Sequence, residues 1–299
     1  MTTSALLRRM PDEVRALRAA WPSVAQDVPE LDEELEQEFR FGQRITRTER
    51  GYVLGGPMKG GSSSMWQPAT KEQYRAFRRW QTREGLLEGR DDEAYARLRE
   101  LLARHQVELV TRRGVAQGRK GVPDPEPFPG YGPMYGHMAA ILEALPEQHL
   151  QSETLERIQL GGWGPDAAKA SAYHERAVLM YDFACRGARR TFLGLFLHEL
   201  GHAFESALSE PSKDALYAGY KALSETDAFY GVEFLLDAAT RVLYQKFVFV
   251  EFLAETYMVY TACGQALRDK IASYPPPARE AWERVYDVLR ASVHGIEYE

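Results

Sequence analysis

Two histidines four residues apart constrain the fold of this chain more than any other feature. They stand in the stretch Thr191-Phe-Leu-Gly-Leu-Phe-Leu-His-Glu-Leu-Gly-His-Ala-Phe204, which is too long and too apolar for a strand. On a helix, residues i and i+4 lie about one turn apart on the same face. His198 and His202 therefore present two imidazoles in the same direction. Such a pair can bind one zinc ion, with zinc–nitrogen distances of about 2.0–2.1 Å.

Glu199 follows the first histidine directly. Glu199 is poorly placed to bind the same ion, but its carboxylate can reach a water molecule bound to that ion. The carboxylate can accept the proton of this water and later pass it to a leaving group. These are the mechanical reasons for the HExxH signature of zinc peptidases. The alternative is that His198 and His202 are ordinary core residues on a buried helix, hydrogen-bonded to other protein groups.

A catalytic zinc ion keeps three protein ligands and one open position. No third histidine follows closely, since the next is His294, so the third ligand must be sought among carboxylates. Glu225 is the nearest rival, but its polar neighbours favour a helix cap or a loop. The remaining candidates downstream are Asp227, Glu233, Glu251 and Glu255.

The segment Lys246–Tyr260 favours Glu251. It reads as an apolar helix interrupted by two glutamates, Glu251 and Glu255, four apart on one face. Burying an unpaired carboxylate costs several kcal/mol, so each needs a strong partner. A metal ligand at Glu251 and a hydrogen bond from Glu255 to a ligand histidine would satisfy both. The alternatives are pairing with arginines elsewhere in the chain, or a solvated stripe.

Glu251-Phe-Leu-Ala-Glu255, downstream of His-Glu-Leu-Gly-His, resembles the catalytic domain of anthrax toxin lethal factor and its bacterial relatives, which are glutamate-zincins. The resemblance covers about residues 135–265. It implies one zinc ion per chain with Glu251 as the third ligand. It also implies a tyrosine seven residues before that ligand, here Tyr244, which would donate its phenolic proton to the oxyanion. The alternative for Tyr244 is a tyrosine that only packs against the helix.

Zincins also present an edge strand, just before the active helix, that pairs with an extended substrate. The segment Tyr173–Phe183 stands in that place, and we expect one strand there and another at Glu156–Leu160. His174 and Asp182 are interpreted as ordinary strand residues. The predicted fold class is α+β: a predominantly helical, zincin-like metallopeptidase domain over residues 126–299, with a small β-sheet before the HExxH helix.

Residues 1–125 are predicted to form a separate, mainly helical region with a short hairpin, and their role is left open. The glycine- and serine-rich stretch Gly55–Ser64 is predicted to be a loop. Thr70 and Gln73 form a capping-box pair that opens a helix to about Arg83. The proline-rich stretch Gly114–Gly136 is predicted to be a linker or a long surface loop.

The remaining features bound the partners and the compartment. A net charge of −6 argues against a nucleic-acid partner, and no apolar run is long enough for a membrane span. The N-terminus lacks the apolar core of a signal peptide, and the two cysteines are interpreted as buried, reduced thiols. We therefore expect a cytoplasmic protein, or one exported without an N-terminal signal peptide, that acts on a peptide or protein substrate.

The predicted function is that of a zinc-dependent endopeptidase with Glu199 as general base. Two alternatives stay open at this point: a catalytically inactive binding protein with a peptidase fold, and a metal-dependent hydrolase of non-peptide substrates. The sequence does not specify the substrate or the oligomeric state.

Overall fold

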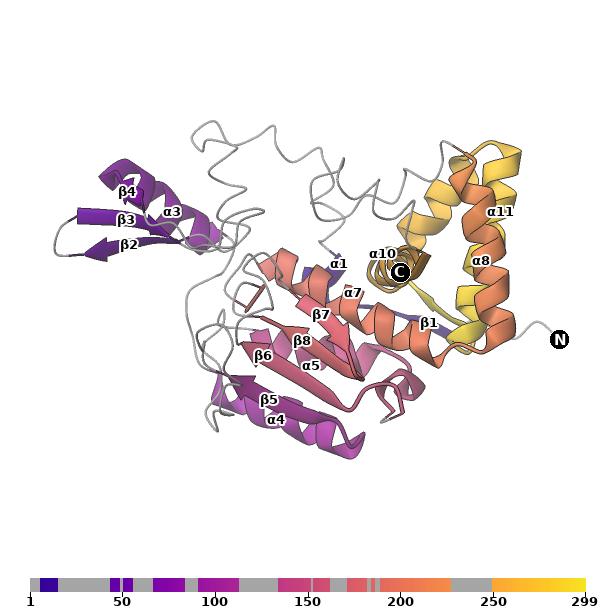
Figure 1. Ribbon diagram of the computed structural model, residues 1–299, viewed down its shortest axis with the longest axis horizontal. Coiled ribbons are helices and arrows are strands. Elements are labelled where there is room, and N and C mark those ends of the chain that lie inside the picture. Colours follow the sequence, from indigo (N-terminus) through magenta and orange to yellow (C-terminus); the bar gives the residue numbers. More distant parts are fainter. Residues whose placement is uncertain are drawn as a thin grey trace. The chain divides into compact units, whose positions relative to one another are not determined.

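The computed structural model describes residues 6–15, 44–48, 51–55, 67–83, 91–112, 134–151, 153–161, 171–181, 184–185, 189–226 and 249–299. They form a mixed α+β structure, as predicted (Figure 1). The chain divides into two compact units, one made of residues 1–23, 140–154 and 197–299, the other of residues 24–139 and 155–196. Helices α5 (Met134–Ala144) and α7 (Arg189–Ala207) contribute residues to both units. The predicted domain boundary near residue 125 falls outside the described residues.

The unit made of residues 24–139 and 155–196 contains a three-stranded antiparallel sheet. Its strands are β2 (Arg44–Thr48), β3 (Gly51–Gly55) and β4 (Gln67–Ala69), in that order. The short hairpin expected in the N-terminal region is present as β2 and β3. Of the loop predicted over Gly55–Ser64, Gly55 alone lies within the described residues, where it ends strand β3, and the rest lies outside them.

Helix α3 (Lys71–Arg83) begins at the predicted capping box. The backbone N–H of Gln73 donates to Thr70 Oγ1 at 3.1 Å, and the backbone N–H of Thr70 donates to Gln73 Oε1 at 2.8 Å. Two backbone donors at the helix start are thus satisfied reciprocally.

The second sheet of this unit has the strand order β5-β6-β8-β7. Strands β5 (Glu108–Arg112), β6 (Arg157–Gly161) and β8 (Ala177–Met180) are parallel, and β7 (Ser171–His174) runs antiparallel to β8 at the end of the order (Figure 1). Helix α4 (Asp92–Arg104) contacts β5, while β6 confirms the strand predicted at Glu156–Leu160.

The single strand predicted over Tyr173–Phe183 is wrong, because the chain reverses within it. His174 pairs with Ala177 across a two-residue turn, Glu175-Arg176, whose φ angles are +49° and +59°. Such tight turns normally carry asparagine or glycine, so a Glu-Arg pair gives no turn signal in the sequence. Peptide binding by strand addition stays a prediction for β7.

The unit made of residues 1–23, 140–154 and 197–299 is largely helical. Its termini meet in a parallel strand pair, β1 (Leu6–Arg8) with β9 (Ile296–Tyr298). Side chains from both strands bond the end of α5: Arg8 Nη1 donates to the Ala144 and Leu145 carbonyls at 3.1 and 2.8 Å, and Tyr298 Oη donates to the Ala144 carbonyl at 3.0 Å. The other elements are α1 (Asp12–Arg15), the 3₁₀ helix η3 (Glu147–Leu150), α8 (Glu210–Ser224), α10 (Phe249–Ser273) and α11 (Pro276–Ser292).

Two further sequence expectations concern burial and membranes. Cys185 and Cys263 are both buried, as predicted. Within the described ranges, no helix combines the length and the apolar character that crossing a membrane requires.

Candidate metal centre

Helix α7 presents the two histidines of the HExxH stretch together, as the i,i+4 spacing predicts. The Nε2 atoms of His198 and His202 lie 3.2 Å apart, with the rings nearly perpendicular at 88°. Both side chains are mostly buried, at 14% and 15% exposed. Two ring nitrogens so close, on one helix face, form two corners of a possible metal site.

Helix α10 supplies the third corner through Glu251. One carboxylate oxygen, Oε2, lies 3.1 Å from His198 Nε2, and the other, Oε1, lies 3.5 Å from His202 Nε2. Within the part of the chain that the structure describes, His198, His202 and Glu251 are the one group of three ligand-type side chains close enough to hold an ion.

The spacing of these atoms fits zinc. Four bonds of about 2.0–2.1 Å at tetrahedral angles place neighbouring ligand atoms about 3.3–3.4 Å apart. The two histidine nitrogens lie 3.2 Å apart and His198 Nε2 lies 3.1 Å from Glu251 Oε2, both near that value, while the 3.5 Å from His202 Nε2 is to the other carboxylate oxygen, Oε1. Two imidazoles and one carboxylate are also a donor set that catalytic zinc sites use.

Glu255 lies behind this cluster, one turn after Glu251. Its side chain is 8% exposed, and Oε1 lies 3.5 Å from His198 Nδ1, the ring nitrogen that faces away from Glu251. A carboxylate there orients the imidazole and favours the tautomer with the proton on Nδ1, which leaves Nε2 free to bind a metal. The hydrogen bond that the sequence predicted between Glu255 and a ligand histidine stays a prediction, because at 3.5 Å the two side chains are in contact without hydrogen-bond geometry.

The cluster strongly favours positive charge. Burial by itself lowers the pKa of His198, but the nearby carboxylates of Glu251, Glu255 and Glu199 raise it to about 10. Burial likewise raises the pKa of Glu251, but the bonds from His198 and His202 bring it well below its usual range. A metal cation bound here would take the place of the proton on His198 and lie against the same carboxylates.

The other candidate residues have different positions. Glu199 is buried on α7 beside His198, 5% exposed. Glu225 is exposed at the C-terminal end of α8, where it forms the helix cap that its polar neighbours favoured. Tyr244, Asp227 and Glu233 lie outside the described residues, so the oxyanion role of Tyr244 stays a prediction. His174 is exposed, 3.6 Å from its neighbour Glu175, and Asp182 is outside the described residues.

A line of contacts between α7 and α10, here called the seam, aligns the two ligand helices. His198 meets Glu251 and Glu255 at its first level. Three residues on, a Cβ atom at Gly201 would lie 2.8 Å from Ala254 Cα. A further three residues on, the rings of Phe204 and Tyr257 stack at 4.6 Å. Both helices advance by three residues per level, so they run in the same direction along the seam.

The second and third levels of the seam, at Gly201 and at Phe204, were not predicted from the sequence. Gly201 carried a usable signal, because a glycine inside an apolar helix often marks a close approach of backbones. The pairing of Phe204 with Tyr257 carried none, since aromatic residues in apolar helices predict burial but not partners.

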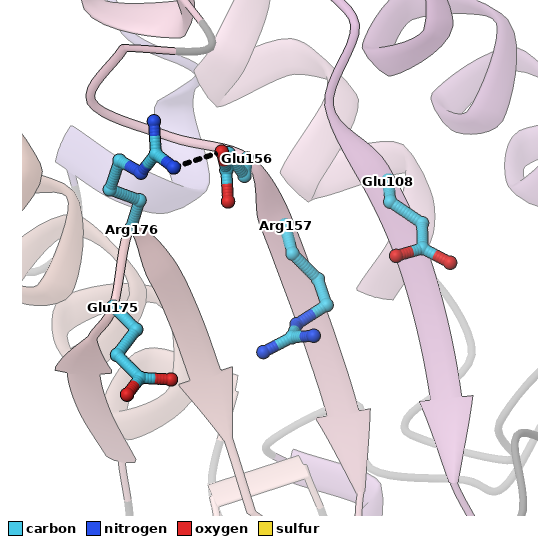
Figure 2. Close-up of a pocket in the computed structure, with 5 residues that line it drawn as sticks. All are labelled: Glu108, Glu156, Arg157, Glu175 and Arg176. Carbon is cyan, nitrogen blue, oxygen red and sulfur yellow. Dashed lines mark ion pairs between the residues drawn. The ribbon is translucent and has the colours of Figure 1, made fainter.

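A hollow lies in the unit made of residues 24–139 and 155–196, at the start of the parallel strands (Figure 2). Its volume is about 520 Å³, and Arg176 forms an ion pair with Glu156 at its edge. All the residues that line it are charged: Glu108, Glu156, Arg157, Glu175 and Arg176. Ligand pockets are mostly apolar with a few polar groups, so this hollow has the character of a solvated charge network.

Comparisons with known proteins found no matching family model, curated protein or solved structure. Any assignment of function to this chain therefore rests on the residues and their geometry. The strongest structural evidence for a function is the convergence of His198, His202 and Glu251.

Proposed function

We propose that this chain is a zinc-dependent endopeptidase with a zincin-like catalytic unit. Zinc would be held by His198, His202 and Glu251, with Glu199 as the general base and Glu255 orienting His198. One observation carries the proposal: two nitrogens from an HExxH helix and a carboxylate from a later helix converge, with one ligand atom from each residue within 4.8 Å of the others. The resemblance of the Glu251–Glu255 segment to glutamate-zincins supports it.

The residues divide the chemistry among them. Zinc, when bound, supplies a Lewis acid that polarises the scissile carbonyl and makes an attacking water more acidic. Glu199 would accept the proton of that water and deliver it to the leaving amine. Glu255 would keep His198 in the tautomer whose Nε2 faces Glu251. Tyr244 would donate a hydrogen bond to the oxygen that gains negative charge.

Glu199→Gln tests the role of the base. The substitution keeps the size of the side chain but removes its ability to take a proton, so it should bind one zinc ion per chain and lose peptide cleavage by at least about 100-fold. The measurements are zinc content of the purified protein and cleavage of a peptide library, each with and without a chelator. Activity retained by Glu199→Gln would overturn the assignment.

The same assays separate the alternatives. An inactive binding protein would bind zinc in its wild-type form but cleave no peptide. A hydrolase of other substrates would bind zinc, leave the library intact and hydrolyse ester or amide model compounds in a chelator-sensitive way. Wild-type protein that binds no zinc would contradict the metal centre itself.

A further inference from the structure

His149 is a buried histidine that the proposed chemistry does not use. It lies on η3 and is 6% exposed. Its Nδ1 atom is 2.8 Å from Tyr257 Oη, and its ring centroid is 4.9 Å from that of Phe204. His149 therefore contacts one residue of α10 and one of α7, both at the last level of the seam.

The third level of the seam combines a hydrogen bond, between His149 and Tyr257, with apolar ring stacking, between Phe204 and Tyr257. Burial lowers the pKa of His149 to about 4, so the ring is neutral at pH 7, and the hydrogen bond to Tyr257 joins two uncharged groups. Phe204 and Tyr257 stack at an interplanar angle of 23°. Stacking alone permits sliding of one ring over the other, whereas the bond to His149 fixes where the Tyr257 hydroxyl lies.

Displacement at this end of the seam reaches the ligands. Tyr257 and Glu251 belong to the same helix, less than two turns apart, with Ala254 pressed against Gly201 between them. A packed helix moves as a unit, so a small rotation of α10 at Tyr257 shifts Glu251 and Glu255 against His198. Zinc–ligand distances in protein sites lie within about 0.2 Å of their typical values, so shifts of this kind would disturb the site.

We propose that His149 and Tyr257 are positioning residues for the metal centre: their hydrogen bond fixes α10 against α7 and so holds Glu251 and Glu255 at His198. This proposal depends on the proposed metal centre. It places a structural support for that centre at the opposite end of the seam, where His149 bonds Tyr257. The competing explanation is that the pair contributes only to the stability of the core.

Four variants separate these explanations. Tyr257→Phe removes the hydroxyl and keeps the ring stacked on Phe204. His149→Leu removes the ring nitrogens, while His149→Asn restores a polar group near the position of Nδ1 that can either donate to or accept from Tyr257. The matched control is Tyr260→Phe, one turn further along α10, which removes a buried hydroxyl that donates to the Ile296 carbonyl of β9 and has no part in the seam.

Three measurements are made on the full chain. Competition with a chromophoric chelator gives the zinc dissociation constant. The visible spectrum of the cobalt(II)-substituted protein reports coordination geometry. Thermal unfolding of the metal-free protein gives the stability that each variant loses.

We expect Tyr257→Phe and His149→Leu to weaken zinc binding about 10-fold and to alter the cobalt spectrum, the low end of the effect of residues that orient metal ligands. His149→Asn should recover most of the affinity, and Tyr260→Phe should lower the unfolding temperature without changing zinc affinity. Equal zinc affinity in all variants, or an equal loss in Tyr260→Phe, would overturn the role of His149 and Tyr257. Wild-type protein that binds no zinc would instead overturn the metal centre.

Discussion

Gly201 on α7 and Ala254 on α10 approach so closely that a Cβ atom at Gly201 would lie 2.8 Å from both the Cα and the carbonyl oxygen of Ala254. The contact joins backbone to backbone, halfway along the seam. Gly201 stands between His198 and His202, and Ala254 stands between Glu251 and Glu255. The backbones of the two helices therefore meet where their ligand pairs face each other, and the absence of a Cβ at Gly201 allows this contact.

Gly201→Ala should separate the ligand helices. Alanine favours a helix over glycine by about 1 kcal/mol, but here its methyl group overlaps backbone atoms that cannot rotate away. We expect a net loss of about 1–3 kcal/mol of stability and weaker zinc binding. Chemical unfolding and chelator competition measure the two effects.

Gly136→Ala on α5 is the matched control. Its Cβ would lie 3.9 Å from Ala94 Cβ, an ordinary contact, so this substitution should be neutral or stabilise the protein by up to about 1 kcal/mol. If Gly201→Ala is as well tolerated as Gly136→Ala, the close approach is not needed for the fold or the site.

Glu251→Ala should abolish specific zinc binding, because it removes one of the three ligands and leaves two histidines. Glu225→Ala, the rival that lies nearer the histidines in the sequence, should bind zinc like the wild type, since Glu225 is exposed at the end of α8. Zinc at about 1,000 times its dissociation constant stabilises a folded protein by about 4 kcal/mol, so it should raise the melting temperature of the wild type and of Glu225→Ala but not of Glu251→Ala. The reverse pattern would assign the third ligand to Glu225.

The local features of the site were predictable from the sequence. Helical spacing determines that His198 and His202 share a face, and two glutamates in an otherwise apolar helix require buried partners. Neither pattern specifies the distance between the helices. That distance depends on Gly201 meeting Ala254, a contact between residues far apart in the chain that side-chain chemistry does not encode.

The errors in the predicted fold have a similar origin. Tyr173–Phe183 has the composition of one strand, and the reversal at Glu175-Arg176 uses left-handed backbone angles that sequence patterns reserve for glycine and asparagine. Strands β1 and β9 are three residues each, too short for a periodicity to be visible. Their pairing depends on the two ends of the chain meeting.

The turn at Glu175-Arg176 should be improvable. Both residues adopt positive φ, which costs residues other than glycine about 1 kcal/mol each. Replacing the pair by Asn-Gly should stabilise the protein by about 1 kcal/mol, measured by urea unfolding. The ion pair of Arg176 with Glu156 would be lost, but both side chains are about half exposed, so it contributes little. Arg176→Ala alone, which loses the ion pair and keeps the unfavourable angle, should show no gain.

Acid should destabilise the protein through His149. Burial lowers the pKa of His149 to about 4 in the folded protein, while the usual value in an unfolded chain is about 6.5. Between these values the unfolded state binds more protons, so the free energy of unfolding decreases as the pH falls from about 6.5 towards 4 and the contribution is fully present only above that window. The difference of about 2.5 pKa units corresponds to a loss of about 3 kcal/mol at most.

Comparison with His149→Asn isolates this effect, because every other titrating group, including His294 near the ring and the ligand histidines, is common to both proteins. We expect the wild type to lose about 2–3 kcal/mol more than His149→Asn between pH 6.5 and pH 4, measured by urea unfolding of the metal-free proteins. Tyr257 does not titrate in this range, because burial raises its pKa well above the usual value. Parallel stability profiles for the two proteins would mean that His149 is accessible to protons while the protein is folded, and that its bond to Tyr257 does not depend on a neutral ring.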